Sequence, residues 1–248
     1  DMSLKLISKQ KPLSHCITNT VVSNFTANGL LAIGASPVMA DAIEEVEEMV
    51  QIADGLLINI GTLNARTVHS MHKAIKAANL KGIPVVLDPV GAGATSYRLQ
   101  TTMDILQKTK VTLIRCNAGE LAAIAGAEWQ GRGVDSGEGT VAIKRLAKEV
   151  ALRFKCLVIV TGEQDVLTDG KQLIHVLGGH PNITKITGTG CLLSAICTAL
   201  LASSTAPLID LNLLLEEYKQ VAVNAYAPIG TFQIQLLNEL EKLAGVPQ

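Results

Sequence analysis

The chain has 248 residues, of which 48% are hydrophobic and 17% charged, and its formal net charge at pH 7 is −1. This composition excludes a disordered chain and favours one large buried core, and the lack of a basic excess argues against nucleic acid as a partner. The longest apolar run, around residues 191–202, is shorter than the roughly 20 residues of a spanning helix, so we expect no membrane partner.

Short apolar runs rich in β-branched residues alternate with longer helical patterns along the chain. In chain order, the patterns predict a helix at residues 21–33, a strand at 55–60, a helix at 63–80, strands at 83–88 and 111–114, helices at 120–125 and 139–154, strands at 156–161 and 173–177, and helices at 190–203, 211–226 and 231–244. A glycine-rich stretch at 131–139 is predicted to be a surface loop.

Four of the five predicted strands are apolar over nearly their whole length, which is typical of strands buried on both faces of a parallel sheet. The repeated strand–helix units indicate an α/β fold of three layers, with a mostly parallel central sheet flanked by helices. No linker or repeat divides the chain, so residues 1–248 are predicted to form a single domain. The strand at 173–177 follows a turn and is expected to form an antiparallel edge hairpin.

Polar and glycine residues follow each predicted parallel strand. Gly61 and Thr62 follow the first strand, Asp88 ends the second, Arg115 follows the third and Thr161 ends the fourth. Ligands of such sheets bind outside the carboxyl ends of the strands. The sequence therefore predicts a functional site at this edge.

Residues Gly188, Thr189, Gly190 and Cys191 lead into an apolar helix. The small residues allow a ligand to approach the backbone, and the helix start offers unpaired N–H groups, so we expect an anion site there. The alternative is an ordinary tight loop before a buried helix. Cys191 is expected to have a lowered thiol pKa at a helix start, unless it is simply a small buried residue.

Asp88 and Glu120 are candidate magnesium ligands. A carboxylate at a strand end, and another beside Asn117 at a helix start, could hold Mg²⁺ through water next to substrate phosphates. The alternatives are a loop cap for Asp88 and an N-terminal capping box for Asn117 and Glu120. Arg115 could neutralise phosphate charge, and its alternative is an ordinary surface position.

Several familiar site types are missing from the sequence. No GxxxxGK[ST] motif occurs, and Gly188-Thr189-Gly190 lacks the further glycine of a dinucleotide fingerprint. His15, His69 and His72 have no metal-site spacing and are interpreted as structural or solvent-facing. The five cysteines are scattered, with no CxxC pair, and no secretory signal is evident, so we expect reduced thiols in a cytoplasmic protein.

The order of these motifs resembles the hydroxyethylthiazole kinases of thiamine salvage, which have a ribokinase-like fold. The resemblance spans the whole chain and rests on His15-Cys16-Ile17-Thr18-Asn19, Asn28-Gly29-Leu30, Gly34-Ala35-Ser36-Pro37-Val38-Met39, Asn59-Ile60-Gly61-Thr62-Leu63, Leu87-Asp88-Pro89-Val90-Gly91-Ala92-Gly93-Ala94, Asn117-Ala118-Gly119-Glu120, Val160-Thr161-Gly162 and Thr187-Gly188-Thr189-Gly190-Cys191. Cys191 stands where the wider ribokinase-like superfamily carries Asp, which points to this family in particular.

The resemblance implies phosphorylation of the alcohol of 4-methyl-5-(2-hydroxyethyl)thiazole by ATP with Mg²⁺. It also implies a homotrimer with active sites between subunits, and a catalytic position for Cys191, which would orient the hydroxyl or accept its proton late. The remaining implied contacts are with nucleotide at Arg115 and Thr161, with thiazole at Met39 and Gly188, and with the same pocket at Asn19, Gly61 and Thr62.

Two other functions stay open at this point. One is another small-alcohol kinase of the same fold, acting on hydroxymethylpyrimidine or pyridoxal, which would be expected to carry Asp in place of Cys191. The other is a catalytically silent protein that binds nucleotide or thiazole. Such a protein should have lost Asp88 or Glu120, and this chain retains both.

Overall fold

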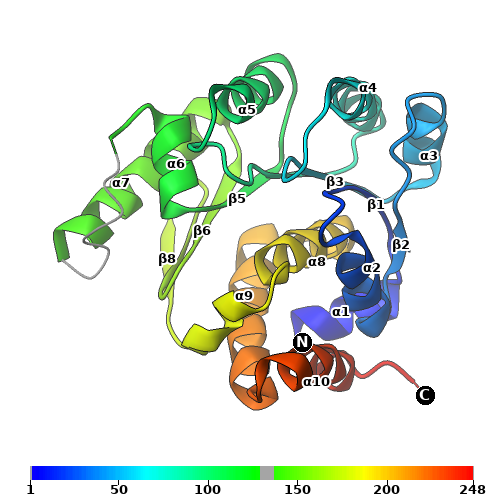
Figure 1. Cartoon of the computed structure of the whole chain (residues 1–248), viewed down its shortest axis with the longest axis vertical. Coiled ribbons are helices and arrows are strands. Elements are labelled where there is room, and N and C mark those ends of the chain that lie inside the picture. The colour runs from blue at the N-terminus through cyan, green and yellow to red at the C-terminus, as the bar shows by residue number, and fades with distance from the viewer. Residues whose placement is uncertain (1, 129–136, 248) are drawn as a thin grey trace.

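The computed structural model describes residues 2–128 and 137–247, and its centre is one eight-stranded sheet with the order β2-β1-β3-β4-β5-β6-β7-β8 (Figure 1). The strands are β1 (Leu13–Ile17), β2 (Ser36–Val38), β3 (Gly55–Asn59), β4 (Val85–Asp88), β5 (Leu113–Asn117), β6 (Leu157–Thr161), β7 (Asp165–Thr168) and β8 (Leu173–Val176). The six strands from β2 to β6 are parallel, which confirms the predicted mostly parallel α/β sheet.

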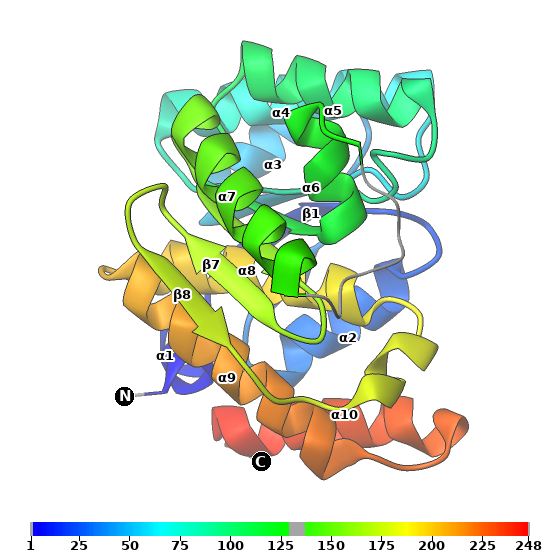
Figure 2. The ribbon, with the colours of Figure 1, turned by 90° about the vertical axis from the view of Figure 1, so that its left-hand side faces the viewer.

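Strands β7 and β8 form the antiparallel edge. β7 pairs antiparallel with β6, and β8 pairs antiparallel with β7, with Thr168 opposite Leu173. Figure 2 shows both strands at this edge, with α7 (Gly137–Phe154) on one side and α9 (Pro207–Ala225) on the other. The predicted edge hairpin is therefore confirmed, and β7 is its partner strand.

Helices cover both faces of the sheet, as Figure 1 shows. One layer consists of α3 (Val46–Ile52), α4 (Ala65–Lys81), α5 (Ser96–Lys108), α6 (Ala118–Ala125) and α7. The other consists of α1 (Ser3–Gln10), α2 (Ser23–Ala32), α8 (Thr189–Ser203), α9 and α10 (Ile229–Ala244), with the 3-10 turn η1 (Pro181–Lys185) before α8. The three-layer prediction is confirmed.

The central strands send alternate side chains into two separate hydrophobic cores. In β3, Leu57 joins the core beneath α8, while Leu56 and Ile58 join the core beneath α4. In β4, Val86 and Leu87 divide in the same way. This period of two is the pleat of a strand buried on both faces, and it explains why these runs carry no polar alternation.

Helix α8 is the most enclosed element of its layer. Every residue from Leu192 to Leu201 is buried, and the helix packs against β1, β3 and β4 as well as α1, α2 and α9. Close packing against the sheet uses Gly55, where an added Cβ would lie 3.1 Å from Thr198. The sheet thereby fixes the start of α8 at the carboxyl ends of the strands.

Several elements differ from the predictions. The sequence patterns missed β1, β2, β7, α1, α3 and α5, and they placed β5 at residues 111–114 although it spans Leu113–Asn117. The glycine-rich stretch predicted as a loop spans residues 131–139. Its end belongs to α7, which begins at Gly137, and residues 131–136 of the stretch lie outside the described residues. In the two described ranges, no helix is long and apolar enough to cross a bilayer.

Candidate active site

The predicted site residues meet where four neighbouring parallel strands end. Asn59 ends β3, Asp88 ends β4, Arg115 lies in β5 and Thr161 ends β6. Residue Ser194, on the second turn of α8, reaches the same point. Segments separated by more than a hundred residues thus supply one connected group of side chains.

A buried ion pair forms the centre of this group. Nη2 of Arg115 donates to Oδ2 of Asp88 at 2.6 Å, and the two residues are only 6% and 0% exposed. Burial opposes the charged guanidinium, but the adjacent Asp88 carboxylate outweighs it and the pKa of Arg115 is raised. The surface alternative for Arg115 is therefore wrong.

Two hydroxyl groups accept further hydrogen bonds from the guanidinium of Arg115. Nε of Arg115 donates to Oγ of Ser194 at 2.8 Å, and Nη1 donates to Oγ1 of Thr161 at 2.9 Å. Ser194 in turn donates to Oδ2 of Asp88 at 2.8 Å. Because each guanidinium nitrogen gives one hydrogen bond to another residue in the described part of the chain, one N–H on each terminal nitrogen is left over there and could bind an anionic ligand.

Asp88 presents one oxygen that the described residues do not satisfy. Oδ2 accepts from Arg115, Ser194 and, at 3.4 Å, Asn59, whereas Oδ1 is buried and has no hydrogen-bond partner within residues 2–128 and 137–247. A buried carboxylate oxygen without a partner is costly, and a water or a hydrated cation would satisfy it. In the described ranges no group of three or more His, Cys, Asp or Glu side chains could enclose a metal. The donor set therefore fits Mg²⁺ held by few carboxylates, with water and phosphate as its other ligands.

Glu120 forms the predicted capping box. Its Oε1 accepts from the backbone N–H of Asn117 at 2.9 Å, and Asn117 accepts from the N–H of Glu120 at 2.8 Å. Oε2 of Glu120 also accepts from the N–H of Gly91 at 2.7 Å, which ties α6 to the loop after β4. Burial raises the pKa of Glu120, and these backbone hydrogen bonds oppose the shift. The structural alternative is thus confirmed, while the magnesium contact stays a prediction.

The start of α8 is built to expose its backbone. Gly188 has φ +92°, and a Cβ there would lie 2.7 Å from Cγ1 of Val22. A Cβ on Gly190 would lie 3.1 Å from Nη1 of Arg115. The carbonyl of Thr189 accepts from the Tyr218 hydroxyl at 2.6 Å, and because a trans peptide is planar, this contact also fixes the N–H of Gly190. The N–H groups at the helix start and the adjacent Arg115 have the chemistry of an anion site, and the anion contact stays a prediction.

Cys191 corrects one prediction. Burial raises the pKa of its thiol, and the nearby Asp88 carboxylate adds to the shift, so the expected lowering is wrong. The helix-start effect is outweighed because the side chain is half-buried beside a carboxylate. The amide of Asn19 donates to its Sγ at 3.6 Å. At neutral pH, Cys191 is a neutral thiol within hydrogen-bond reach of a polar side chain.

Three of the predicted substrate contacts cluster around Asn59. Its Oδ1 accepts from Nδ2 of Asn19 and from the N–H of Gly61, both at 2.9 Å. Thr62 accepts from the N–H of Thr20 at 3.0 Å, which holds the two loops together. Cys191 lies beside this cluster through Asn19.

Met39 lies elsewhere in the fold. It directly follows the edge strand β2, which β1 separates from β3, and its side chain is partly buried against the core of the α8 layer. Its neighbour Ala40 is anchored by Nε2 of His15, at 2.6 Å from the carbonyl oxygen. His15 is fully buried, which agrees with a structural interpretation.

A cavity of about 810 Å³ opens beside the ion pair. Arg115, Thr161, Thr189 and Gly190 are among the residues that line it. The sequence did not indicate other lining residues, which include Gly178, Gly179, His180, Pro181, Tyr218 and Lys219. Lys219 pairs with the buried Asp165 at 3.4 Å, an ion pair between α9 and β7 that no spacing in the sequence indicates.

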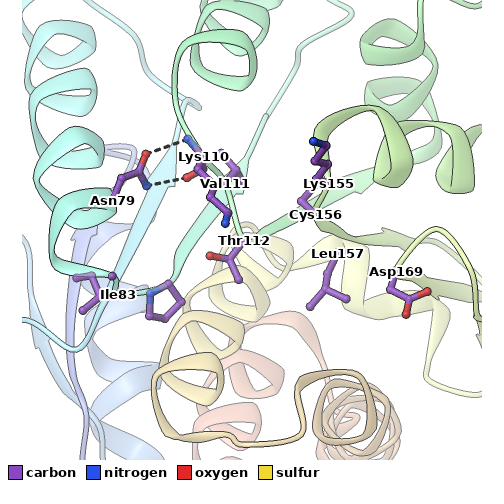
Figure 3. A pocket seen from close by; sticks show the side chains of 11 residues that line it. Asn79, Ile83, Lys110, Val111, Thr112, Lys155, Cys156, Leu157 and Asp169 are labelled. Carbon is purple, nitrogen blue, oxygen red and sulfur yellow. Dashed lines mark hydrogen bonds between the residues drawn. The ribbon is translucent and has the colours of Figure 1, made fainter.

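A second hollow, of about 540 Å³, lies at the opposite edge of the sheet (Figure 3). It is lined by residues before β4, β5 and β6, including Pro84, Thr112 and Cys156. The side chain of Asn79 makes two hydrogen bonds to the backbone of Lys110, each 2.9 Å. These bonds tie α4 to the chain after α5, and the hollow faces away from the site described above.

The fold is that of the ribokinase-like class, since it also occurs in a ribokinase-like superfamily protein from Enterococcus faecalis, with a TM-score of 0.69 and 12% identity. The same fold occurs in a pyridoxal kinase from Bacillus subtilis solved with ADP, with a TM-score of 0.61 and 16% identity, covering 84% of this chain and 90% of that one.

Within this class, the chain belongs to the hydroxyethylthiazole kinase family, which matches residues 4–245. A hydroxyethylthiazole kinase from Lysinibacillus sphaericus is 55% identical over 98% of this chain and 96% of its own length. One from Haemophilus influenzae is 48% identical over 97% and 94%. The solved hydroxyethylthiazole kinase protein of Pyrococcus horikoshii OT3 has a TM-score of 0.87 and 41% identity, covering 97% of this chain and 91% of that one.

Proposed function

We propose that this chain transfers the γ-phosphoryl group of ATP, with Mg²⁺, to the hydroxyl of 4-methyl-5-(2-hydroxyethyl)thiazole in thiamine salvage. Membership of the family along nearly the whole chain supports this substrate. The observation that carries the chemistry is the buried Asp88–Arg115 pair directly beside the start of α8. This arrangement supports a site in which the guanidinium and backbone N–H groups would meet the charge that develops on the phosphate.

Transfer of a phosphoryl group passes through a loose transition state, so positioning and charge stabilisation matter more than a strong base. The remaining N–H groups of Arg115 and the N–H groups from Gly188 to Cys191 would bind the transferred phosphoryl oxygens. Thr161 holds the guanidinium in place from the β6 side. A bound Mg²⁺, held through water at Oδ1 of Asp88 and by Glu120, would supply charge neutralisation between the phosphates.

Cys191 would orient the substrate hydroxyl. Its thiol is neutral because burial and Asp88 raise its pKa, so it acts as a hydrogen-bond partner rather than as a thiolate. Asn19 contacts the sulfur and also Asn59, which fixes the position of this group. Gly61 allows that arrangement, since a Cβ there would lie 2.6 Å from Nδ2 of Asn19.

A homotrimer with active sites between subunits is part of the proposal. Within one chain, Met39 follows edge strand β2, whereas Cys191 lies in the first turn of α8, which packs against β3 and β4. This separation supports a Met39 segment that completes the site of a neighbouring protomer. The five free cysteines support a reducing, cytoplasmic setting.

The test is release of ADP from Mg-ATP by the purified chain with hydroxyethylthiazole, compared with hydroxymethylpyrimidine and pyridoxal. Release that depends on the thiazole is the expected result. Release with only a pyrimidine or with pyridoxal would replace the substrate while keeping the phosphotransferase. If none of the three supports release while ADP still binds, the chain is a silent binding protein and the proposal fails.

A further inference from the structure

Ser194 links the two charged residues of the site. It is fully buried on α8, one turn after Cys191, so both side chains lie on the same face of the helix. Its hydroxyl accepts from Nε of Arg115 and donates to Oδ2 of Asp88, both at 2.8 Å. Within the sequence it looks only like a polar interruption of an apolar helix.

The geometry of the guanidinium shows what this hydroxyl does. Nε and one terminal nitrogen of an arginine form a fork that commonly binds both oxygens of one carboxylate. Here Ser194 occupies one branch of the fork, and Oδ2 of Asp88 occupies the other. The second oxygen of Asp88, Oδ1, is therefore left without a partner among the residues that the structure describes, although it is buried.

We propose that Ser194 is a positioning residue that keeps Oδ1 of Asp88 free for the hydrated Mg²⁺ of the nucleotide complex. This inference rests on the proposed function, because it concerns the same phosphate site. Without the hydroxyl, Nε of Arg115 has no acceptor. The guanidinium would then pair with both oxygens of Asp88, so that Oδ1 would no longer be available to a hydrated Mg²⁺.

Removal of the hydroxyl should therefore reduce the factor by which Mg²⁺ strengthens ADP binding, which we call magnesium coupling. The affinity for metal-free ADP should change much less. Arg115 stays charged and keeps its contact with Thr161, so metal-free ADP should bind Ser194→Ala within about twofold of wild type. The factor by which Mg²⁺ strengthens ADP binding should fall about tenfold, the effect typical of losing an outer hydrogen bond to a metal ligand.

The experiment is titration calorimetry of ADP with and without Mg²⁺, which requires no turnover. Thr198→Val is the matched control, because Thr198 is a buried hydroxyl one turn further along α8 that donates to the backbone carbonyl of Ser194 at 2.9 Å. Ser194→Cys keeps the side-chain volume but hydrogen-bonds weakly, and it should behave like Ser194→Ala.

The magnesium coupling of these variants distinguishes a positioning role of Ser194 from a purely structural one. Reduced coupling in both Ser194 variants, with normal coupling in Thr198→Val, supports the proposal. Equal coupling in wild type and Ser194→Ala, or loss of metal-free ADP binding, overturns it. Unfolding of both Ser194 variants beside a stable Thr198→Val would show a purely structural role and also overturn it. If wild type binds no ADP or shows no magnesium coupling, the proposed function itself fails.

Discussion

Cys191 joins the two halves of the site, since Asn19 contacts its sulfur and the backbone proposed to bind the phosphate lies directly before it. Cys191→Ala should leave folding intact and lower kcat by less than about 10⁴-fold, the upper range for a general base. Because the thiol pKa is raised above its ordinary value of 9.0, no thiol ionisation should appear in kcat between about pH 6 and 8.

The measurement is the pH profile of kcat for wild type and Cys191→Ala, with circular dichroism to compare folding. The two profiles should have the same shape. A loss of about 10⁵-fold, or an ionisation step present only in wild type, would show that Cys191 removes the proton as a base.

Glu120 holds two backbone N–H groups at once. In Glu120→Gln, one of the two oxygens becomes an NH₂ group that faces the N–H of Asn117 or Gly91. The free energy of unfolding should fall by about 1–3 kcal/mol, the cost of an unsatisfied buried donor. Urea unfolding of this variant, compared with the exposed control Glu241→Gln, measures the effect.

The same variant tests the metal contact. If Glu120 helps to hold Mg²⁺, the magnesium requirement of the folded Glu120→Gln protein should rise. An unchanged requirement together with reduced stability would leave Glu120 as a structural cap and remove it from the magnesium site.

At the scale of elements, the start of α8 depends on the backbone of Gly188. A side chain at φ +92° costs about 1–2 kcal/mol, and the clash with Val22 adds to it. Gly188→Ala should therefore lower the melting temperature and weaken phosphate binding. Gly230→Ala in α10 is the control, because an added Cβ there meets nothing within 4 Å. Equal melting temperatures for the two variants would contradict this view of the loop.

Elements with a clear hydrophobic pattern could be predicted from the sequence, and short or polar ones could not. β3, β4 and β6 are continuous apolar runs, so their burial in a parallel sheet was evident. β1 contains Ser14 and His15, which are polar and yet buried, because neighbouring elements cover them. Their polarity hides the strand in the sequence. β2 has only three residues, including Pro37, and becomes a strand through pairing with β1.

The same distinction applies to the site. The loops after the strands and the start of α8 carry local signals in glycine, Asp and Asn, so their place at one sheet edge could be predicted. The partners within the site could not, because Asp88, Arg115 and Ser194 are far apart in sequence and only the sheet order joins them. The prediction that the thiol pKa of Cys191 is lowered was wrong for the same reason, because that pKa depends on burial and on the distant residue Asp88.

At the scale of the whole molecule, one sheet connects all the described layers, and we propose that the chain forms one domain. Because α8 contacts strands and helices from both ends of the chain, its layer cannot unfold alone without exposing the central sheet. Scanning calorimetry should therefore give one unfolding transition. Its calorimetric enthalpy should equal the van't Hoff enthalpy, which is the test for a single cooperative unit. Two separate transitions would show independent domains.

The enclosure of α8 also determines how its backbone amides meet solvent. Active-site segments often come from the least stable parts of a protein, and their amides exchange with deuterium through local opening. The amides from Leu192 to Leu201 lie in a helix buried along its length, so they can exchange only when the core opens. The proposed phosphate-binding end of α8 therefore rests on a helix whose amides we expect to exchange slowly, in contrast to active-site segments that open locally.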